Sequence, residues 1–396
     1  MISKSTCGAL VIYIATFNVL LLAETFMFKS PAFPCSSRIG FGLPICRHLR
    51  PEINFLHDTV EHPDAKQGRR RDPWTDLDMM LVDYTPDFTV IVSLHNHASV
   101  SWETIGNLFN QTRGIWEAVL VFDDCQDGSL NVVHNLIKRW LRSDKFQSTQ
   151  CHTAVLTRVR CIVQPTAVWE TASDNIGFRV ARPSQFYMLV QADMTAFDEA
   201  FNIKLAAPMD VYSDLFAVSG RCSHNLVQRS SNKAQAGRCG TDIAKPLAQQ
   251  EFAARQNTVF VRDTVNRGPL LLRADRLLSL GFLDEKNFHQ GDDDHNLMLR
   301  AFLNHGWKSA HFHVGFVAPL EYGSTRRVDP KPPSKSQKQY LEGRLNQVNR
   351  SDHQRMIETI AELPGWNQDR PISQREVDDV VQQHTNRVHY LHSCSH

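Results

Sequence analysis

The chain has 396 residues, of which 42% are hydrophobic and 21% are charged, and its formal net charge is +1. This composition is that of a globular protein, and the length suits one large domain with appendages or two smaller domains. The near-neutral charge argues against a nucleic-acid-binding protein, because such proteins usually carry a surplus of basic residues.

The first predicted element is an apolar segment near the N-terminus. Between Gly8 and Phe28 the only charged residue is Glu24. The length of this segment approaches the ~20 residues with which a helix spans a bilayer. We therefore predict an uncleaved signal anchor, a transmembrane helix, within residues 1–28; a cleaved signal peptide and a buried core helix are the alternatives. The anchor predicts a single-pass type II membrane protein that faces the lumen of the Golgi or the endoplasmic reticulum.

Residues 29–85 contain Pro, Arg, Asp and His without sustained periodicity, which is typical of a stem or linker. None of the nine cysteines forms a C-x-x-C pair, so a zinc ribbon is not indicated. In a lumenal chain, Cys35 with Cys46 and Cys222 with Cys239 are candidate disulfides, since each pair is close in sequence.

An alternation of strand and helix patterns begins at Phe88. Runs of β-branched and aromatic residues are typical of strands buried in a parallel sheet, and amphipathic stretches between them are typical of helices. Strand, helix, strand, helix means βαβ units, so we predict an α/β domain over residues 86–322 with a mainly parallel sheet flanked by helices. The first predicted strands are Phe88–Leu94, Ala118–Phe122, Ala154–Val159 and Phe186–Val190.

The second half of the chain is less regular. Residues 220–257 are rich in polar residues and Gly and are predicted to form an insertion or lid. A strand at Thr258–Val261 and a helix from about Asp293 to His305 follow. Residues 323–396 are predicted to be a C-terminal extension with surface helices at about 337–362 and 373–386.

Three acidic clusters fall at predicted strand ends or at a helix start: Asp123-Asp124, Asp193 and Asp292-Asp293-Asp294. Ligands of open α/β sheets bind at the carboxyl ends of the strands. One such cluster alone is more often a helix cap or a turn. Three of them in one domain repel one another and need a counter-charge, which a divalent cation such as Mg²⁺ or Mn²⁺ supplies through oxygen ligands.

Residues 88–130 resemble the opening of the inverting family-2 glycosyltransferases, which have the Rossmann-like GT-A fold with a mixed, mainly parallel sheet. The matching pieces are the strand Phe88–Leu94, the turn His95-Asn96-His97 and the strand that ends in Asp123-Asp124. The resemblance implies that Asp123 and Asp124 contact the nucleoside of a nucleotide-sugar donor. His95, which stands where the family often has Tyr, and Asn96 are placed in the same donor site.

The resemblance continues through Ser173–Ala181 to the segment Gln191-Ala192-Asp193. Most relatives have Asp-x-Asp here, so the resemblance implies that Asp193 is the ligand of Mn²⁺ or Mg²⁺. Gln191 belongs to the donor site, and its substitution for Asp predicts weaker metal binding. His311 and His313 follow on a predicted strand; a third metal ligand comes from this region in some GT-A enzymes, and a core or surface histidine is the alternative.

Residues 266–300 resemble the acceptor segment of the family, which ends in an acidic motif followed by Leu-x-x-Arg. Alignment on Leu297 and Arg300 makes Asp294 the first candidate for the catalytic base and Asp293 the second. Arg273 or Arg300 is expected to assist at the donor diphosphate; the alternative for Arg300 is an exposed helix residue paired with an acid.

The resemblance covers about residues 87–320. It implies a hexosyltransferase-like glycosyltransferase that moves a sugar, with inversion and metal assistance, from a nucleotide-sugar donor to a hydroxyl of a glycan, lipid or protein acceptor. The alternative is a catalytically silent GT-A domain that acts as a lumenal binding or assembly partner, which Gln191 in place of Asp motivates.

Overall fold

The computed structural model of the chain describes residues 77–144, 152–221, 223–224, 257–262, 264–289, 293–317 and 368–394. The predicted signal anchor, most of the predicted stem, both candidate disulfides, Asp292 and the helix expected at 337–362 lie outside the described residues. Within these ranges, no helix is both long and apolar enough to cross a membrane.

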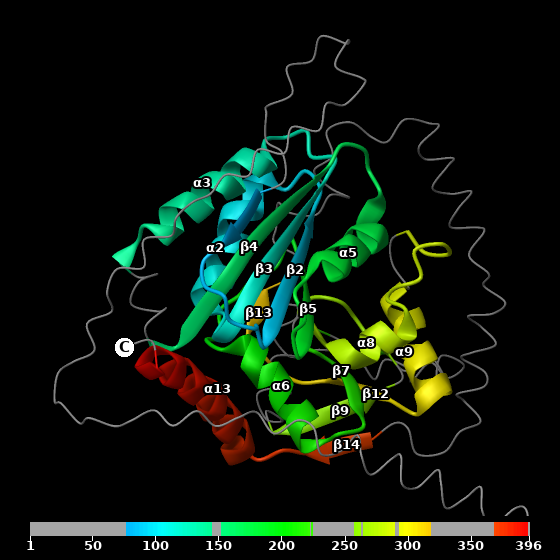
Figure 1. Cartoon of the computed structure of the whole chain (residues 1–396). Helices are drawn as coiled ribbons and strands as arrows, with labels where there is room; N and C mark the ends of the chain where they lie inside the picture. The colour runs from blue at the N-terminus through cyan, green and yellow to red at the C-terminus, as the bar shows by residue number, and fades with distance from the viewer. Residues whose placement is uncertain are drawn as a thin grey trace, which may run out of the picture. The chain divides into compact units, whose positions relative to one another are not determined.

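A ten-stranded sheet forms the centre of the described structure (Figure 1). In spatial order the strands are β1 (Leu77–Met80), β4 (Ala154–Gln164), β3 (Gly114–Asp123), β2 (Phe88–Leu94), β5 (Phe186–Gln191), β11 (Leu270–Arg273), β7 (Leu215–Ser219), β12 (Lys308–His311), β9 (Thr258–Arg262) and β14 (Gln368–Pro371). β4, β3, β2 and β5 are parallel neighbours, and β7, β12 and β14 point in the same direction. β1, β11 and β9 run the opposite way. The predicted mixed, mainly parallel sheet is therefore confirmed.

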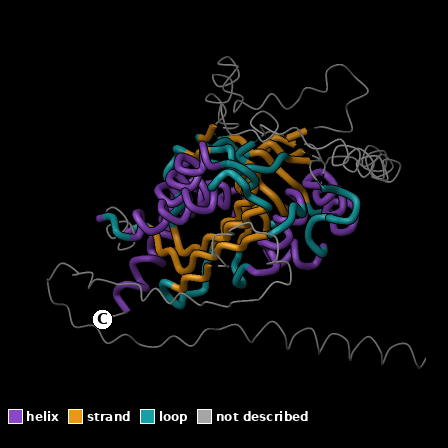
Figure 2. The backbone as a smooth tube through the Cα atoms, turned by 90° about the horizontal axis from the view of Figure 1, so that it is seen from above, coloured by secondary structure: helices purple, strands orange, loops and turns teal. Residues whose placement is uncertain are grey.

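Helices cover both faces of the sheet, as the view from above shows (Figure 2). Alternate residues of each strand point to opposite faces, so Val90 and Val92 of β2 pack in one core while Ile91 packs in the other. The first core includes residues of α2 (Ala98–Gln111), α3 (Ser129–Leu141), α6 (Phe201–Val211) and α13 (Gln374–Cys394). The second core includes residues of α5 (Trp169–Val180), α8 (Ala274–Leu280) and α9 (Asp293–His305).

The strand β3 is buried along its whole length because it lies inside the sheet between β4 and β2 and is covered on both faces. This explains why its sequence is a nearly continuous apolar run rather than an alternation. Two short pairs complete the described strands: β6 (Thr195–Ala196) pairs with β13 (Phe316–Val317), and β8 (Ser223–His224) pairs with β10 (Thr264–Val265) next to the main sheet.

Residues 368–394 pack on the rest of the domain. β14 adds to the sheet edge at β9, and α13 lies against α6 and β3. Buried His384 of α13 contacts the buried carboxylate of Asp87 at 3.0 Å, and Arg387 contacts the same carboxylate at 2.5 Å. This part of the predicted C-terminal extension therefore contributes a strand and a helix to the α/β layers.

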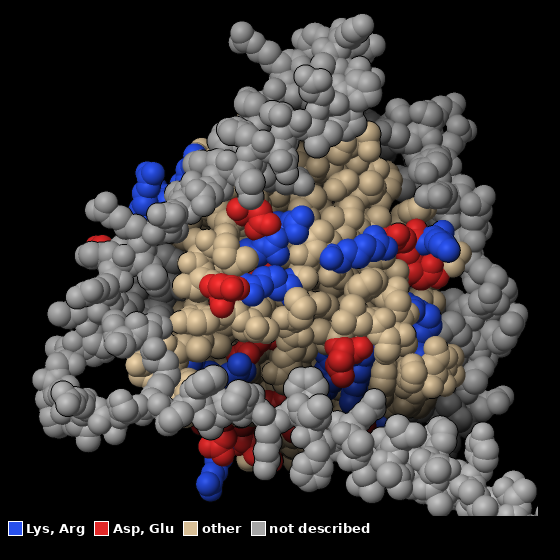
Figure 3. Space-filling model, in the orientation of Figure 1, with Lys and Arg blue, Asp and Glu red and all other residues tan. Residues whose placement is uncertain are grey.

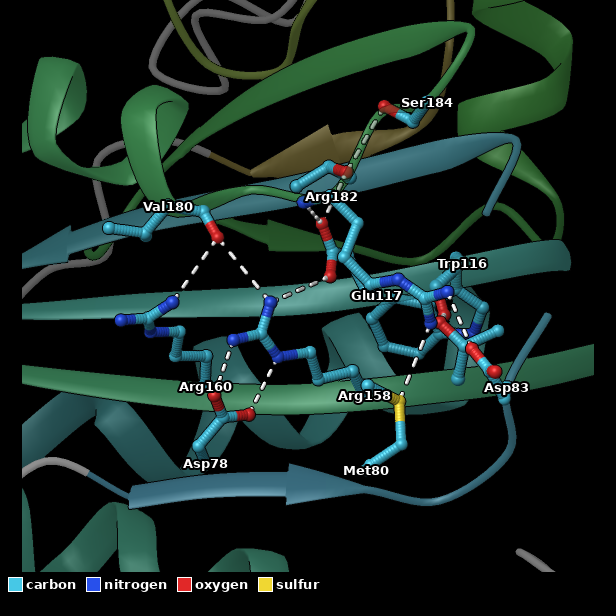
Figure 4. A network of polar contacts seen from close by, with 12 residues as sticks. Asp78, Met80, Asp83, Trp116, Glu117, Arg158, Arg160, Val180, Arg182 and Ser184 are labelled. Carbon is cyan, nitrogen blue, oxygen red and sulfur yellow. Dashed lines mark hydrogen bonds and ion pairs between the residues drawn. The ribbon is translucent and has the colours of Figure 1, made fainter. Parts of the chain in front are cut away.

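Glu117 of β3 is fully buried and lies at the centre of a polar network that holds β1 and the amino-terminal ends of the neighbouring strands (Figure 4). Its carboxylate accepts hydrogen bonds from the Thr89 hydroxyl at 2.8 Å and from the Arg182 backbone N–H at 2.6 Å. Arg158 lies 3.8 Å from the second oxygen and pairs with Asp78 on β1. Burial raises the pKa of Glu117, so these partners are needed to keep its charge in the core.

Charged side chains of both signs lie next to one another on the face shown in Figure 3. The domain contains ion pairs between basic and acidic side chains, such as Arg182 with Asp83 and Arg113 with Glu199. The distribution agrees with the formal net charge of +1 and gives this face no extended field of one sign.

Candidate functional site

The carboxyl ends of three parallel strands meet at one edge of the sheet. Ser93 of β2 is in register with Gln191 of β5, and Leu94 is in register with Phe122 of β3. The turn after β2, the acidic pair at the end of β3 and the segment after β5 therefore leave the sheet side by side. The structure thus brings together His95, Asn96, Asp123, Asp124, Gln191 and Asp193.

The turn after β2 is fixed to the end of β3 by its own polar side chains. The ring nitrogen Nδ1 of His95 lies 2.6 Å from the backbone oxygen of Asp123. Asn96 has a φ of 54°, which an Asn tolerates better than most residues, and its side-chain oxygen accepts the backbone N–H of Gln126 at 2.8 Å. These contacts orient the predicted donor-site residues without using a ligand.

Both carboxylate oxygens of Asp123 already accept hydrogen bonds from the protein backbone. Its two carboxylate oxygens accept the backbone N–H groups of Val168 and Trp169, at 2.7 and 2.9 Å, and so hold the start of α5 over the strand end. Burial raises the pKa of Asp123, and these two hydrogen bonds counteract that effect. Asp124 is half-buried, and within the described residues only one of its oxygens has a hydrogen bond, from the Gln126 side chain at 2.6 Å. Asp124 is therefore the more available of the pair.

The end of β5 carries an amide where the resemblance led us to expect a carboxylate. The Gln191 side-chain oxygen accepts a hydrogen bond from the guanidinium of Arg221, which follows β7. Gly268, with a φ of +75°, lies against the same side chain: a Cβ at Gly268 would be 2.9 Å from Cγ of Gln191. The backbone oxygen of Ala192 accepts the buried hydroxyl of Thr104 at 2.9 Å, which fixes the turn that leads to half-buried Asp193.

The described residues contain no group of three or more His, Cys, Asp or Glu side chains placed to hold a metal ion. Asp193 supplies one carboxylate at the strand end. Mg²⁺ is commonly held by one or two protein carboxylates together with substrate phosphates, so a single carboxylate fits an ion that a diphosphate helps to bind.

His311, considered above as a third metal ligand, is a buried core residue with 1% of its surface exposed. Its Nδ1 lies 3.1 Å from the backbone oxygens of Ser219 and Arg221, and burial lowers its pKa to about 4.

Four carboxylates surround the buried guanidinium of Arg267. Its Nη1 lies 3.0 Å from Glu170 and 2.9 Å from Asp174, and its Nη2 pairs with Asp293. Its backbone N–H donates to Oδ2 of Asp294 at 2.9 Å. One guanidinium therefore faces more negative charge than it neutralises, and burial raises the pKa of Asp174 to about 6 even though Arg267 opposes that rise.

The two candidate bases differ in their surroundings. Asp293 is fully buried and accepts the Thr171 hydroxyl at 3.0 Å, and its other oxygen has no hydrogen bond within the described residues. Asp294 keeps 11% of its side chain exposed and accepts two backbone N–H groups, those of Arg267 and His295. Asp294 is therefore the more accessible of the two candidate bases, and Asp293 is a partner of Arg267.

The acidic cluster adjoins the strand-end edge. Ser93, in register with Gln191, donates its hydroxyl to Asp174 at 2.6 Å. The consecutive residues Arg267 and Gly268 contact Asp294 and Gln191, respectively. One loop thus connects the candidate base to the segment that precedes Asp193.

Arg273 and Arg300, which the resemblance led us to expect at the donor diphosphate, do not lie at this site. Arg273 is in register with Phe186 at the start of β5, because β11 runs antiparallel to β5, and its guanidinium donates to the backbone oxygens of Leu215 and Met209. Arg300 donates to the backbone oxygens of Leu280 and Phe282 and so closes the end of α8. Neither guanidinium is placed at the strand-end edge.

Sequence reasoning missed three members of this region: Arg221, Arg267 and Asp174. Arg267 precedes the Gly268-Pro269 turn, and a charged residue beside such a turn is a weak signal by itself. Asp174 lies in the helix that the resemblance covers, but its contact with Arg267 spans distant segments. No pattern in the sequence shows which carboxylates and guanidinium groups meet.

No family model and no curated protein matches this chain. Among solved structures, it is similar to S. aureus TarS residues 1–349, with 14% identity, a TM-score of 0.36, and coverage of 59% of this chain and 60% of that chain. It covers 37% of a longer TarS chain. It is also similar to the mannosyltransferase PcManGT from Pyrobaculum calidifontis in complex with GDP-Man and Mn²⁺, with 14% identity, a TM-score of 0.41, and coverage of 79% and 74%. Because these TM-scores lie below 0.5, we base the function on the chain's own residues.

Proposed function

We propose that this protein is a glycosyltransferase of the GT-A type that transfers a sugar, with inversion, from a nucleotide-sugar donor to an acceptor hydroxyl. The observation that supports it is the meeting of Asp124 and Asp193 at one strand-end edge, with Asp294 joined to that edge through the Arg267-Gly268 loop. A nucleoside and a diphosphate along the strand ends and a base beyond them are what such a transfer requires.

In the proposed reaction, Asp294 accepts the proton of the acceptor hydroxyl as its oxygen attacks the anomeric carbon. The bond between that carbon and the donor diphosphate oxygen breaks, and the diphosphate leaves with the electron pair. Arg267 and the first turn of α9 hold the Asp294 carboxylate in place through the two backbone N–H groups. Inversion follows when acceptor oxygen and leaving group lie on opposite faces of the sugar.

Asp193 would hold a divalent cation, Mn²⁺ or Mg²⁺, together with the donor diphosphate. When bound, the ion supplies positive charge against the charge that develops on the leaving group. His95, Asn96 and Asp124 are proposed to line the nucleoside side of the same edge, and Asp123 holds the start of α5 beside them. UDP and GDP-Man are present in structures of similar proteins, and the same donor class is proposed for this chain.

The acceptor is proposed to be a glycan, lipid or protein, and the chain to be anchored by its N-terminal segment with the domain in the Golgi or endoplasmic reticulum lumen. A second candidate function is a catalytically silent domain that binds a lumenal partner. The pairing of Gln191 with Arg221 favours it, because it fills one position of the expected metal motif with an amide.

Donor turnover by the full-length chain tests the first proposal. A panel of nucleotide sugars is incubated with the protein with and without Mn²⁺, and release of the nucleoside diphosphate is measured with and without candidate acceptors. Turnover of one donor supports the transferase and identifies its sugar. Binding of a partner together with no turnover of any donor favours the silent domain.

A further inference from the structure

Arg221 stands at the strand-end edge with its backbone fixed from both sides. Its N–H donates to the Ser219 hydroxyl at 2.9 Å, and its carbonyl oxygen accepts from the buried ring of His311 at 3.1 Å. Gly220 precedes it in a packed turn, since a Cβ there would lie 2.6 Å from Val314. The backbone from which the Arg221 side chain extends is therefore held in place before any ligand binds.

The guanidinium of Arg221 is held by a side-chain amide. Several other arginines of the domain pair with carboxylates, for example Arg158 with Asp78 and Arg370 with Asp214. Others, such as Arg273 and Arg300, donate to backbone oxygens. Within the described residues, Arg221 has no carboxylate partner, and its one side-chain hydrogen bond goes to the neutral amide oxygen of Gln191. A guanidinium has five N–H donors, so in the part of the chain that the structure describes most of those of Arg221 have no acceptor and can meet a ligand.

The amide at Gln191 orients this positive charge without cancelling it. A carboxylate at the same position would form an ion pair with Arg221 and neutralise it. Gly268 lies next to the Gln191 side chain: a Cβ at Gly268 would be 3.2 Å from the side-chain oxygen of Gln191. The result is a half-buried, oriented cation beside the segment that leads to Asp193, in the place where the sequence lacks the first carboxylate of the expected metal motif.

We propose that Arg221, held by Gln191, binds the diphosphate of the donor directly and supplies fixed positive charge that part of the family's metal site would otherwise provide. The proposal rests on the proposed function. Guanidinium groups recognise phosphate oxygens through paired hydrogen bonds, and a half-buried site strengthens them. As the bond from the anomeric carbon to the diphosphate oxygen breaks, Arg221 stabilises the charge that the leaving diphosphate gains. Diphosphate binding therefore persists when divalent ions are removed.

The test measures binding of UDP, GDP, uridine and guanosine to the full-length chain by calorimetry, in the presence of a chelator. We expect one of the two diphosphates to bind. In Arg221→Gln its Kd should rise about 10- to 100-fold, as for loss of a charge-assisted hydrogen bond, while binding of the matching nucleoside stays the same. Arg276→Gln is the matched control, because Arg276 donates to the backbone oxygens of Ser213 and Leu215, away from the strand-end edge.

A second variant, Gln191→Glu, tests whether Arg221 binds the diphosphate without removing the arginine. Gln191→Glu has nearly the same shape and places a carboxylate against Arg221, so diphosphate binding in chelator should weaken about as much as in Arg221→Gln. Arg221→Lys keeps the charge and should retain part of the affinity. These two variants separate loss of the cation from loss of the fold.

The outcomes separate the two proposals. If the wild-type chain binds a diphosphate in chelator but Arg221→Gln and Gln191→Glu bind it equally well, the role of Arg221 is overturned and the transferase proposal stands. If diphosphate binding by the wild-type chain disappears completely in chelator and returns with Mn²⁺, the metal alone accounts for that binding. The role of Arg221 is then also overturned. If the folded wild-type chain binds neither diphosphate under either condition, the donor class itself is contradicted.

Discussion

The backbone N–H of Arg267 donates a 2.9 Å hydrogen bond to Oδ2 of Asp294, while the guanidinium of Arg267 is buried among Glu170, Asp174 and Asp293. The buried charge cluster therefore fixes the loop, and the loop fixes the carboxylate. The next residue, Gly268, packs against Gln191. Substitutions in this loop should thus affect both the proposed base and the proposed diphosphate side of the site.

Asp294→Asn should abolish most donor turnover and leave donor binding nearly unchanged, because the amide keeps the shape but cannot accept the proton. Loss of a general base typically costs about 10²- to 10⁴-fold in rate. Asp275→Asn is the matched control: Asp275 is an exposed acid in the first turn of α8, as Asp294 is an acid in the first turn of α9. Turnover by Asp294→Asn at the wild-type rate would refute its role as the base.

Gly268→Ala should weaken diphosphate binding more than its effect on stability alone explains. The new Cβ would lie 2.9 Å from Cγ of Gln191, and the φ of +75° strains any L-residue. Gly281→Ala is the control, because Gly281 has a φ of +76° but no atom within 4 Å of its added Cβ. Both variants should lose ~1–2 kcal/mol of unfolding free energy from the backbone alone. Equal diphosphate affinity in the two variants would show that Gly268 does not position Gln191.

Asp174→Asn should change how stability depends on pH. Burial raises the pKa of Asp174 from 3.8 to about 6, so its contribution to stability is fully present below pH 3.8 and is lost as the pH rises through 6. An asparagine does not ionise and avoids that loss. The stability of the variant relative to wild type should therefore increase between pH 4 and pH 7, on the order of 1–3 kcal/mol.

Denaturant unfolding of wild type and Asp174→Asn between pH 4 and pH 7 measures this difference in unfolding free energy. His311, whose pKa burial lowers to about 4, has the opposite trend: its contribution is present above pH 6.5 and is lost as the pH falls through 4. That trend is common to both proteins and cancels in their difference. A difference that does not change with pH would mean that the pKa of Asp174 is not raised in the folded protein above its value in the unfolded chain.

The extent of sequence prediction is clearest where local pattern decides the structure. The strand Phe88–Leu94 and the helix Asp293–His305 were predicted with the bounds that the structure shows, since an apolar β-branched run and an amphipathic period are local signals. β3 begins at Gly114 rather than Ala118, because Trp116 and Glu117 are buried by partners that the sequence does not reveal.

The expectation that Arg273 assists at the donor diphosphate, made in a segment that resembles the family, fails for a reason that the sequence does not show. The rule that ligands bind where strands end holds for the parallel strands. β11 enters the sheet antiparallel between β5 and β7, so its last residue, Arg273, emerges at the opposite edge. Strand order and direction depend on contacts between distant segments, as do the surroundings of Arg267 and Arg221, and no local pattern encodes them.

His384→Ala should destabilise the fold by about 2–4 kcal/mol without changing the affinity of folded protein for a donor. The variant leaves a cavity under α13 and removes one of the two side chains, His384 and Arg387, that contact the buried Asp87 carboxylate. His389→Ala, an exposed histidine on the same helix, should have little effect on the unfolding free energy. If both variants unfolded at the same denaturant concentration, α13 would not be a structural part of the domain.

Titration of the full-length chain with a panel of nucleotide sugars, in the presence of Mn²⁺, tests the proposed function most directly. We expect saturable binding of one donor, competition by its nucleoside diphosphate, and loss of affinity in Asp193→Ala. A folded chain that binds no nucleotide sugar and no nucleoside diphosphate would contradict the proposal.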